Sequence, residues 1–265
     1  MSEAHGFDRE PLAADAAASY LAELWRSGRQ VTALPPELRP SSLEEGYDIQ
    51  DRLVAALGER VVGWKLGVGS RKGKIDSKVG RAIAGRVLAS RCVRTGETVR
   101  LPDRAPVTVE FEIAYVLARD IPPGDRLGDP LDAIAEIRTT VELVRARFVD
   151  RRSVGWPSFA ADNAGFEALI VGEVVDPARL ADIAPSTQVL VDGHERARAL
   201  TGDDVTDVET AFTDFVALAR ERGMMLPKGS IISTGTVSKP FVIEGTAEVS
   251  ARYLDTAIEF KTEVA

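Results

Sequence analysis

The segment Val107-Thr-Val-Glu-Phe-Glu-Ile-Ala-Tyr115 constrains the fold more than any other part of this chain, because its apolar and polar residues alternate. Side chains along a β-strand point to opposite faces in turn. One face of such a strand is then apolar throughout, and the other face carries Glu110 and Glu112. The segment predicts a strand over residues 107–117 that buries one face in a core and presents two carboxylates on the other.

The N-terminal quarter has a helical pattern instead. Residues 12–26 are rich in alanine, and their apolar residues recur at helical spacing. A second helix is predicted to begin at Ser41 or Ser42, since each is followed three residues later by a glutamate, as in a capping box. Its predicted end is Leu57, because Gly58 follows directly.

From residue 61 onward the pattern changes to short strands separated by turns. The predicted strands cover residues 61–66, 107–117, 140–148, 188–191, 230–233, 247–253 and 258–262, with one late helix over 205–222. Asp192-Gly193 predicts a hairpin turn. Helices followed by many strands indicate an α+β fold with an antiparallel or mixed sheet. We expect a helical N-terminal region over residues 1–60 and a β-rich domain over residues 61–265, together forming one structural unit.

Composition and charge exclude several classes of function. The net charge of −8 argues against a nucleic-acid partner, since phosphate binding needs a positive field. The N-terminal segment is acidic and lacks the pattern of a signal peptide. No stretch approaches the roughly 18 apolar residues that a membrane span needs. Cys92 is the only cysteine, which suits a reducing compartment. We therefore expect a cytoplasmic protein without membrane partners.

The two glutamates of the alternating strand suggest a metal site. Carboxylates a few ångströms apart repel each other unless a positive charge lies between them, and hard cations such as Mg²⁺ or Mn²⁺ prefer carboxylate oxygens. Glu142 adds a third carboxylate if residues 140–148 form a strand. Residues 132–147 also fit one helix, which would place Glu142 on a helix surface. A solvated strand face is the alternative for the glutamate pair.

The segment Gly63-Trp-Lys-Leu-Gly-Val-Gly-Ser70 is the second candidate for chemistry. Lys65 lies among apolar residues and glycines, so we expect it to be partly desolvated and able to transfer protons. The alternative is a lysine that reaches solvent along its aliphatic stem. The glycine spacing fits neither a dinucleotide-binding nor a phosphate-binding loop. His5 and His194 are the only histidines, and neither is placed for a catalytic triad or a histidine zinc site.

Five segments match, in order and in approximate spacing, the motifs of one known family. They are Gly63–Ser70, Val109–Tyr115, Val141–Arg147, Ala161–Ala164 and Ile232–Thr236. Together they resemble the 2-keto-4-pentenoate hydratases and 4-oxalocrotonate decarboxylases, within the fumarylacetoacetate hydrolase superfamily. The resemblance runs from about residue 10 to the C-terminus. It implies a homo-oligomeric enzyme of aromatic-compound catabolism, in which a helical N-terminal region precedes a mixed β-sandwich roll.

The resemblance also implies roles for individual residues. It makes Glu110, Glu112 and Glu142 the ligands of Mg²⁺ or Mn²⁺. It makes Lys65 catalytic and Asp162 a second catalytic candidate, although Asp162 and Asn163 can equally form a structural turn. The implied substrate contacts are Lys65, Leu66, Ser70, Asn163 and Thr234. Residues 71–85 and 202–206 depart from the family pattern. These departures leave the three implied metal ligands in place and concern the part of the site that would bind the substrate.

The implied reaction is the addition of water to a 2-keto-4-enoate, or 2-hydroxydienoate, which yields a 4-hydroxy-2-keto acid. Decarboxylation of a 4-oxalocrotonate-type 2-keto acid is the alternative, because both reactions need the same metal and lysine. Hydrolysis of an acylpyruvate relies on a glutamate–histidine pair, and no suitable histidine exists here. An inactive partner subunit would not need Lys65 and the three glutamates. The resemblance further implies a complex with a homologous decarboxylase or hydratase.

Overall fold

The structure, a computed structural model, describes residues 9–125 and 128–265. These residues form two compact units, one of residues 9–60 with 146–166 and one of residues 61–125, 128–145 and 167–265. Residues 146–166 thus fall in the first unit, and the division into residues 1–60 and residues 61–265 stays a prediction. His5 lies outside the described residues.

The first unit is helical. It contains α1 (Arg9–Ser27), α2 (Leu43–Leu57), α4 (Gly155–Ala161) and the short 3₁₀ turns η1 (Pro36–Leu38) and η4 (Asn163–Gly165). Ser42 caps α2 by accepting the N–H of Glu45, and Gly58 ends it with a left-handed φ of 69°. Both predicted ends of α2 are therefore confirmed. Apolar faces of α1 and α2 enclose a core that also takes in Ala146 and Phe148.

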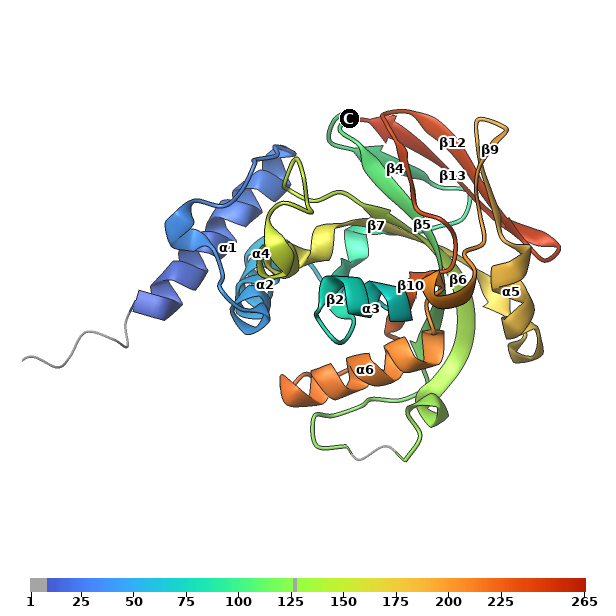
Figure 1. The fold of residues 1–265 in the computed structure, drawn as a ribbon, viewed down its shortest axis with the longest axis horizontal. Coiled ribbons are helices and arrows are strands. Elements are labelled where there is room, and N and C mark those ends of the chain that lie inside the picture. The colour runs from blue at the N-terminus through green and yellow to red at the C-terminus, as the bar shows by residue number, and fades with distance from the viewer. Residues whose placement is uncertain (1–8, 126–127) are drawn as a thin grey trace, which may run out of the picture. The chain divides into compact units, whose positions relative to one another are not determined.

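In the described part of the second unit, eight strands form one mixed sheet in the order β2-β1-β10-β5-β6-β7-β3, with β11 added beside β5. Their bounds are β1 (Val61–Gly67), β2 (Ile83–Leu88), β3 (Cys92–Arg94), β5 (Val107–Leu117), β6 (Ile134–Val144), β7 (Phe166–Val175), β10 (Ile231–Thr236) and β11 (Phe241–Ile243). The β1–β10 and β3–β7 pairs are parallel, whereas β10–β5 and β5–β6 are antiparallel. Figure 1 shows β6 as a long strand that bends along its length.

A second sheet of five described strands runs in the order β4-β13-β12-β8-β9. Its strands are β4 (Thr98–Leu101), β8 (Gln188–Val191), β9 (His194–Arg198), β12 (Ala247–Tyr253) and β13 (Thr256–Val264). The β8–β9 hairpin turns at Asp192 and Gly193, both with positive φ, as predicted. The two sheets meet where the Phe111 and Tyr253 rings lie 5.3 Å apart.

The second unit also contains the helices α3 (Arg71–Ser77), α5 (Leu180–Ser186) and α6 (Val208–Glu221), together with the 3₁₀ turns η2 (Ala89–Arg91), η3 (Pro130–Ala133), η5 (Pro177–Arg179) and η6 (Gly202–Asp204). Helix α6 packs against the large sheet, whereas α5 contacts β12 of the second sheet. From α6, Phe215 packs 5.4 Å from Trp64, and Phe212 packs 5.4 Å from Tyr115. None of the described helices is long and apolar enough to cross a membrane.

The predicted α+β fold is confirmed, with N-terminal helices followed by mixed sheets. Residues 107–117 form β5 as predicted. Residues 134–144 form β6, so the single helix over 132–147 is wrong, and so is the extension of this strand to residue 148. The late helix begins at Val208 instead of residue 205, because the Asp207 side chain caps it. The strand β7 and the helix α3 were not predicted.

Candidate metal centre and active site

The register of β5 against β6 brings the three predicted glutamates together. Glu110 lies directly opposite Glu142, and Glu112 lies opposite Thr140, two residues along the same strand face. One carboxylate oxygen from each glutamate lies within 4.8 Å of the others. Glu112 and Glu142 are fully buried, whereas Glu110 is half-buried. A solvated strand face therefore does not describe this site.

Lys65 reaches the same cluster from β1. Its Nζ lies 2.9 Å from Oε1 of Glu142, and its side chain is only 2 % exposed. The alternative of a lysine that reaches solvent is therefore wrong. If all three carboxylates and the lysine are ionised, they leave two negative charges in a largely buried place, which is costly in a low dielectric. A divalent cation would balance these charges, so the residues present fit such an ion.

Strand β10 holds the carboxylate of Glu112 from one side. Oε2 of Glu112 accepts hydrogen bonds from Ser233 Oγ at 2.6 Å and from the Gly235 N–H at 3.1 Å. Oε1 of Glu112 has no hydrogen-bond partner among the described residues. A buried carboxylate oxygen without a donor is a group that a cation can satisfy.

Burial raises the pKa of Glu112 well above its usual range. The nearby charges of Glu142 and Glu110 raise this pKa further, whereas the Ser233 hydrogen bond and the Lys65 charge oppose the rise. The folded, metal-free protein therefore holds a proton on Glu112 at pH values where the unfolded chain has lost it. A metal ion must displace that proton, because the ligand is the carboxylate.

This proton predicts a pH dependence with a definite sign. Glu112 has its ordinary pKa in the unfolded chain and a raised pKa in the folded protein. Between these two values the folded state binds more protons than the unfolded state, so the free energy of unfolding without metal should fall as pH rises. One proton limits this slope to about 1.4 kcal/mol per pH unit. The rise in melting temperature on adding Mg²⁺ should grow as pH increases through the same range, because less of the bound proton then remains for the ion to displace. Differential scanning fluorimetry with EDTA and with Mg²⁺ measures both trends, and Glu112→Gln should remove them.

Three predicted substrate contacts have other roles in the structure. The Thr234 hydroxyl donates to the Ile113 carbonyl at 2.7 Å. Ser70 caps α3, since its Oγ accepts the Gly73 N–H at 3.0 Å. The buried Leu66 follows Lys65 in β1, so its side chain points to the opposite face of the strand. Substrate contact by these residues stays a prediction.

Two residues that the sequence analysis did not single out, Ser233 and Thr140, contact the glutamate cluster or each other. Ser233 is the neighbour of the predicted Thr234, and Thr140 lies two residues before Glu142 in β6. Side-chain alternation in a strand would have pointed to Thr140, because residues two apart share a face. Ser233 could be identified only from the pairing of β10 with β1 and β5.

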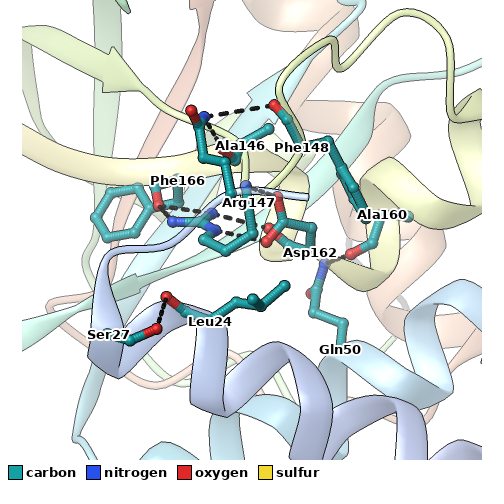
Figure 2. Close-up of polar contacts among 10 residues, drawn as sticks. Leu24, Ser27, Gln50, Ala146, Arg147, Phe148, Ala160, Asp162 and Phe166 are labelled. Carbon is teal, nitrogen blue, oxygen red and sulfur yellow. Dashed lines mark hydrogen bonds and ion pairs between the residues drawn. The ribbon is translucent and has the colours of Figure 1, made fainter. Parts of the chain in front are cut away.

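Asp162, the second catalytic candidate, belongs to the first unit and is paired there with Arg147. Figure 2 shows the Arg147 guanidinium between the Asp162 carboxylate and the Phe166 carbonyl. Arg147 Nε donates to Asp162 Oδ1 at 2.6 Å, and the Arg147 N–H donates to Oδ2 at 2.7 Å. The guanidinium also lies 4.1 Å from the centre of the Trp25 ring. Arg147 thus engages both carboxylate oxygens of Asp162, Oδ1 through a buried ion pair and Oδ2 through its backbone N–H.

Asn163 follows Asp162 in a turn with unusual backbone angles. Asn163, Ala164 and Gly165 all have positive φ, of 51°, 50° and 68°. Non-glycine residues rarely adopt this region, and asparagine does so more readily than most. The structural turn named as the alternative for these residues is present, and a substrate contact by Asn163 stays a prediction.

Breaking the buried pair should cost much more than breaking an exposed one. Asp162→Asn leaves the Arg147 charge buried without its carboxylate, so we expect the free energy of unfolding to fall by about 3–5 kcal/mol. Asp15→Asn is the matched control, because Asp15 pairs with Arg52 on the surface of the same unit, and it should cost about 1 kcal/mol or less. Urea unfolding measures both values. An Asp162→Asn protein of normal stability without turnover would instead make Asp162 a chemical group.

Comparison with known proteins shows the family of this chain. Residues 87–259 match the family described as Fumarylacetoacetate (FAA) hydrolase C-terminal. The chain belongs to the fumarylacetoacetate hydrolase family. The match covers the strands that carry all three glutamates, so these residues lie within the family's own domain. The resemblance inferred from the five segments is confirmed.

Within the fumarylacetoacetate hydrolase family, the chain is similar to hydratases and to decarboxylases. It is 31 % identical to the TodF product hydratase of Pseudomonas putida F1, over 63 % of this chain and 62 % of that protein. It is 28 % identical to the 2-keto-4-pentenoate hydratase of Burkholderia vietnamiensis G4, over 90 % of this chain and 92 % of that protein. The matched part thus spans less than two thirds of the first of these relatives.

A solved structure shares the fold over its full length. The 4-oxalocrotonate decarboxylase from Pseudomonas putida G7, complexed with magnesium and adipate, has a TM-score of 0.81. The likeness covers 99 % of this chain and 100 % of that chain at 21 % sequence identity. The same enzyme has also been solved with calcium and acetate.

Proposed function

We propose that this protein is a divalent-metal-dependent hydratase that adds water to a 2-keto-4-enoate and yields a 4-hydroxy-2-keto acid. The observation that carries the proposal is the buried cluster of Glu110, Glu112 and Glu142 with Lys65 beside it. Three carboxylates would suit Mg²⁺ or Mn²⁺, which prefer oxygen ligands and would also attract the oxygens of a small 2-keto acid. The hydratases to which the chain is similar support this reaction class.

The cluster fits a metal ion on three grounds. The carboxylate oxygens converge within 4.8 Å, Oε1 of Glu112 lacks a hydrogen-bond donor among the described residues, and the buried charges sum to two negative units if all are ionised. Glu110, Glu112 and Glu142 would hold the ion. When bound, a divalent cation supplies Lewis acidity that favours negative charge on a keto oxygen.

Lys65 is the residue proposed to move protons. Its Nζ lies 2.9 Å from Oε1 of Glu142, beside the oxygens that would hold the ion. Burial to 2 % exposure keeps the Lys65 side chain out of direct contact with bulk water. A general acid or base must lie within hydrogen-bond reach of the reacting group, and Lys65 is the ammonium beside the described cluster. We therefore assign Lys65 the protonation of a substrate carbon.

Decarboxylation of a 4-oxalocrotonate-type 2-keto acid is the second candidate. One observation favours it, namely 26 % identity to a 4-oxalocrotonate decarboxylase of Pseudomonas sp over 74 % of this chain. Both reactions place negative charge on the same keto oxygen and require protonation of a carbon, so the same glutamates and lysine serve either. Homo-oligomeric assembly and a complex with a homologous hydratase or decarboxylase stay predictions of the resemblance.

The two reactions are separable by the mass of the product. The metal-free protein would be incubated with Mg²⁺ or Mn²⁺ and a panel of 2-hydroxydienoates that includes a 2-hydroxymuconate-derived dicarboxylate. Gain of one water by the substrate supports the hydratase. Loss of CO₂ supports the decarboxylase. No change in any substrate, with metal binding confirmed in the same sample, would overturn both.

A further inference from the structure

Strand β10 makes a contact to the glutamate cluster that neither the family motifs nor the proposed reaction assigns. The parallel register of β1 and β10 places Ser233 beside Lys65. The antiparallel register of β10 and β5 then shifts between Ser233 and Thr236, where Gly235 has a φ of 114°. Such an irregularity re-aims the backbone locally. Here it turns both the Ser233 side chain and the Gly235 N–H toward Glu112.

The hydrogen bonds around Ser233 have one consistent direction. Ser233 Oγ donates its only proton to Oε2 of Glu112 at 2.6 Å. Thr140 Oγ1 lies 2.6 Å from Ser233 Oγ, and it must be the donor in that contact because the serine proton is already used. The three side chains are fully buried. A chain of donated hydrogen bonds therefore runs from Thr140 through Ser233 to the carboxylate.

These hydrogen bonds make the two carboxylate oxygens of Glu112 different from each other. Oε2 accepts from Ser233 and from the Gly235 N–H, whereas Oε1 has no donor among the residues that the structure describes. Rotation of the carboxylate would break two buried hydrogen bonds, which is costly. The carboxylate is thus held in one orientation, with Oε1 left for a cation.

We propose that Ser233 and Thr140 are positioning residues that make Glu112 a one-oxygen ligand and so favour Mg²⁺ over Ca²⁺. The inference rests on the proposed metal centre. Mg²⁺ demands a near-octahedral set of single oxygens, whereas Ca²⁺ accepts more oxygens and takes carboxylates through one or both. A Glu112 carboxylate freed to rotate can offer both oxygens, which the larger ion tolerates and the smaller ion does not.

The test uses calorimetric titration of the metal-free protein with Mg²⁺ and, separately, with Ca²⁺. Ser233→Ala should weaken Mg²⁺ binding by about 10- to 100-fold, the usual effect of removing a partner that orients a ligand. Ca²⁺ binding should change by no more than about threefold, because Ca²⁺ accepts either carboxylate mode. Thr140→Val removes only a hydroxyl from a similar shape and should shift the ratio in the same direction by less. Thr140→Ser keeps the hydroxyl and should behave like the original protein.

The outcomes separate this inference from the proposed function. Equal loss of Mg²⁺ and Ca²⁺ affinity, or no change in either, would overturn the positioning role of Ser233 and Thr140. If Ser233→Ala does not fold, the Thr140→Val and Thr140→Ser pair decides alone. An original protein that binds neither ion would overturn the metal centre together with this inference. Normal ion preferences without turnover of any 2-keto acid would overturn only the reaction.

Discussion

Replacing Glu112 by glutamine is expected to abolish divalent-metal binding and turnover together. The substitution keeps the size of the side chain but removes the negative charge and one acceptor oxygen from a fully buried ligand. Partners that only orient a ligand contribute about 10- to 100-fold to metal affinity, so losing the ligand itself should cost more than about 100-fold. Calorimetric titration with Mg²⁺ and a turnover assay on the same preparation measure both effects.

The stability of this variant should move in the opposite direction. Without metal, an ionised Glu112 would be buried beside Glu142 and Glu110, and a neutral amide avoids both the burial of that charge and the repulsion. The metal-free Glu112→Gln protein should therefore melt at or above the temperature of the metal-free original at neutral pH. Glu263→Gln is the matched control, since Glu263 is an exposed strand residue of β13, and it should change neither binding nor turnover. Retained Mg²⁺ affinity in Glu112→Gln would remove Glu112 from the metal centre.

Replacing Lys65 by methionine is expected to lower kcat by about 10²- to 10⁴-fold, the usual range for a lost acid–base group. Methionine keeps the aliphatic stem and fills most of the buried space, so packing changes little. Metal affinity should not fall, because an ammonium is not a ligand and its removal takes a positive charge away from Glu142. Single-turnover kinetics at saturating Mg²⁺, together with calorimetry, separate this class of variant from the ligand variants.

Lys261→Met is the control for Lys65. Lys261 pairs with Glu248 at 2.5 Å between β13 and β12 of the same unit, and its side chain is 60 % exposed. Its loss should lower stability slightly and leave kcat unchanged. Near-normal kcat in Lys65→Met would reduce Lys65 to a counter-ion of Glu142. The proton would then have to come from a different group, and the proposed mechanism would be wrong.

Local patterns in the sequence predicted the elements whose structure depends on neighbours along the chain. Strand β5 has the predicted bounds because alternation of apolar and polar residues is a property of the segment itself. The ends of α2 were predictable for the same reason, since Ser42, Glu45 and Gly58 act on the adjacent turn of helix. The shared face of Glu110 and Glu112 follows from that alternation alone.

Other elements could not be read from local pattern. The periodicity of residues 132–147 fits either a helix or a strand. The segment forms the strand β6 because it pairs with β5 along its length. Strand β7 is nearly apolar throughout, because the segment is buried on both faces over most of its length and so shows no alternation. The helix α3 has only seven residues, too few for a periodic signal.

The sequence by itself determined which groups could form the site, namely the three glutamates and Lys65, because residue type and strand alternation are properties of the chain. Only the tertiary structure decided how they meet. The pairing of β1 with β10, β10 with β5, and β5 with β6 brings Lys65, Ser233 and Glu142 onto one face. The tertiary structure also shows that the Asp162 carboxylate forms a buried ion pair with Arg147. Strand register and buried ion pairs depend on contacts between segments far apart in the chain, and no local pattern encodes them.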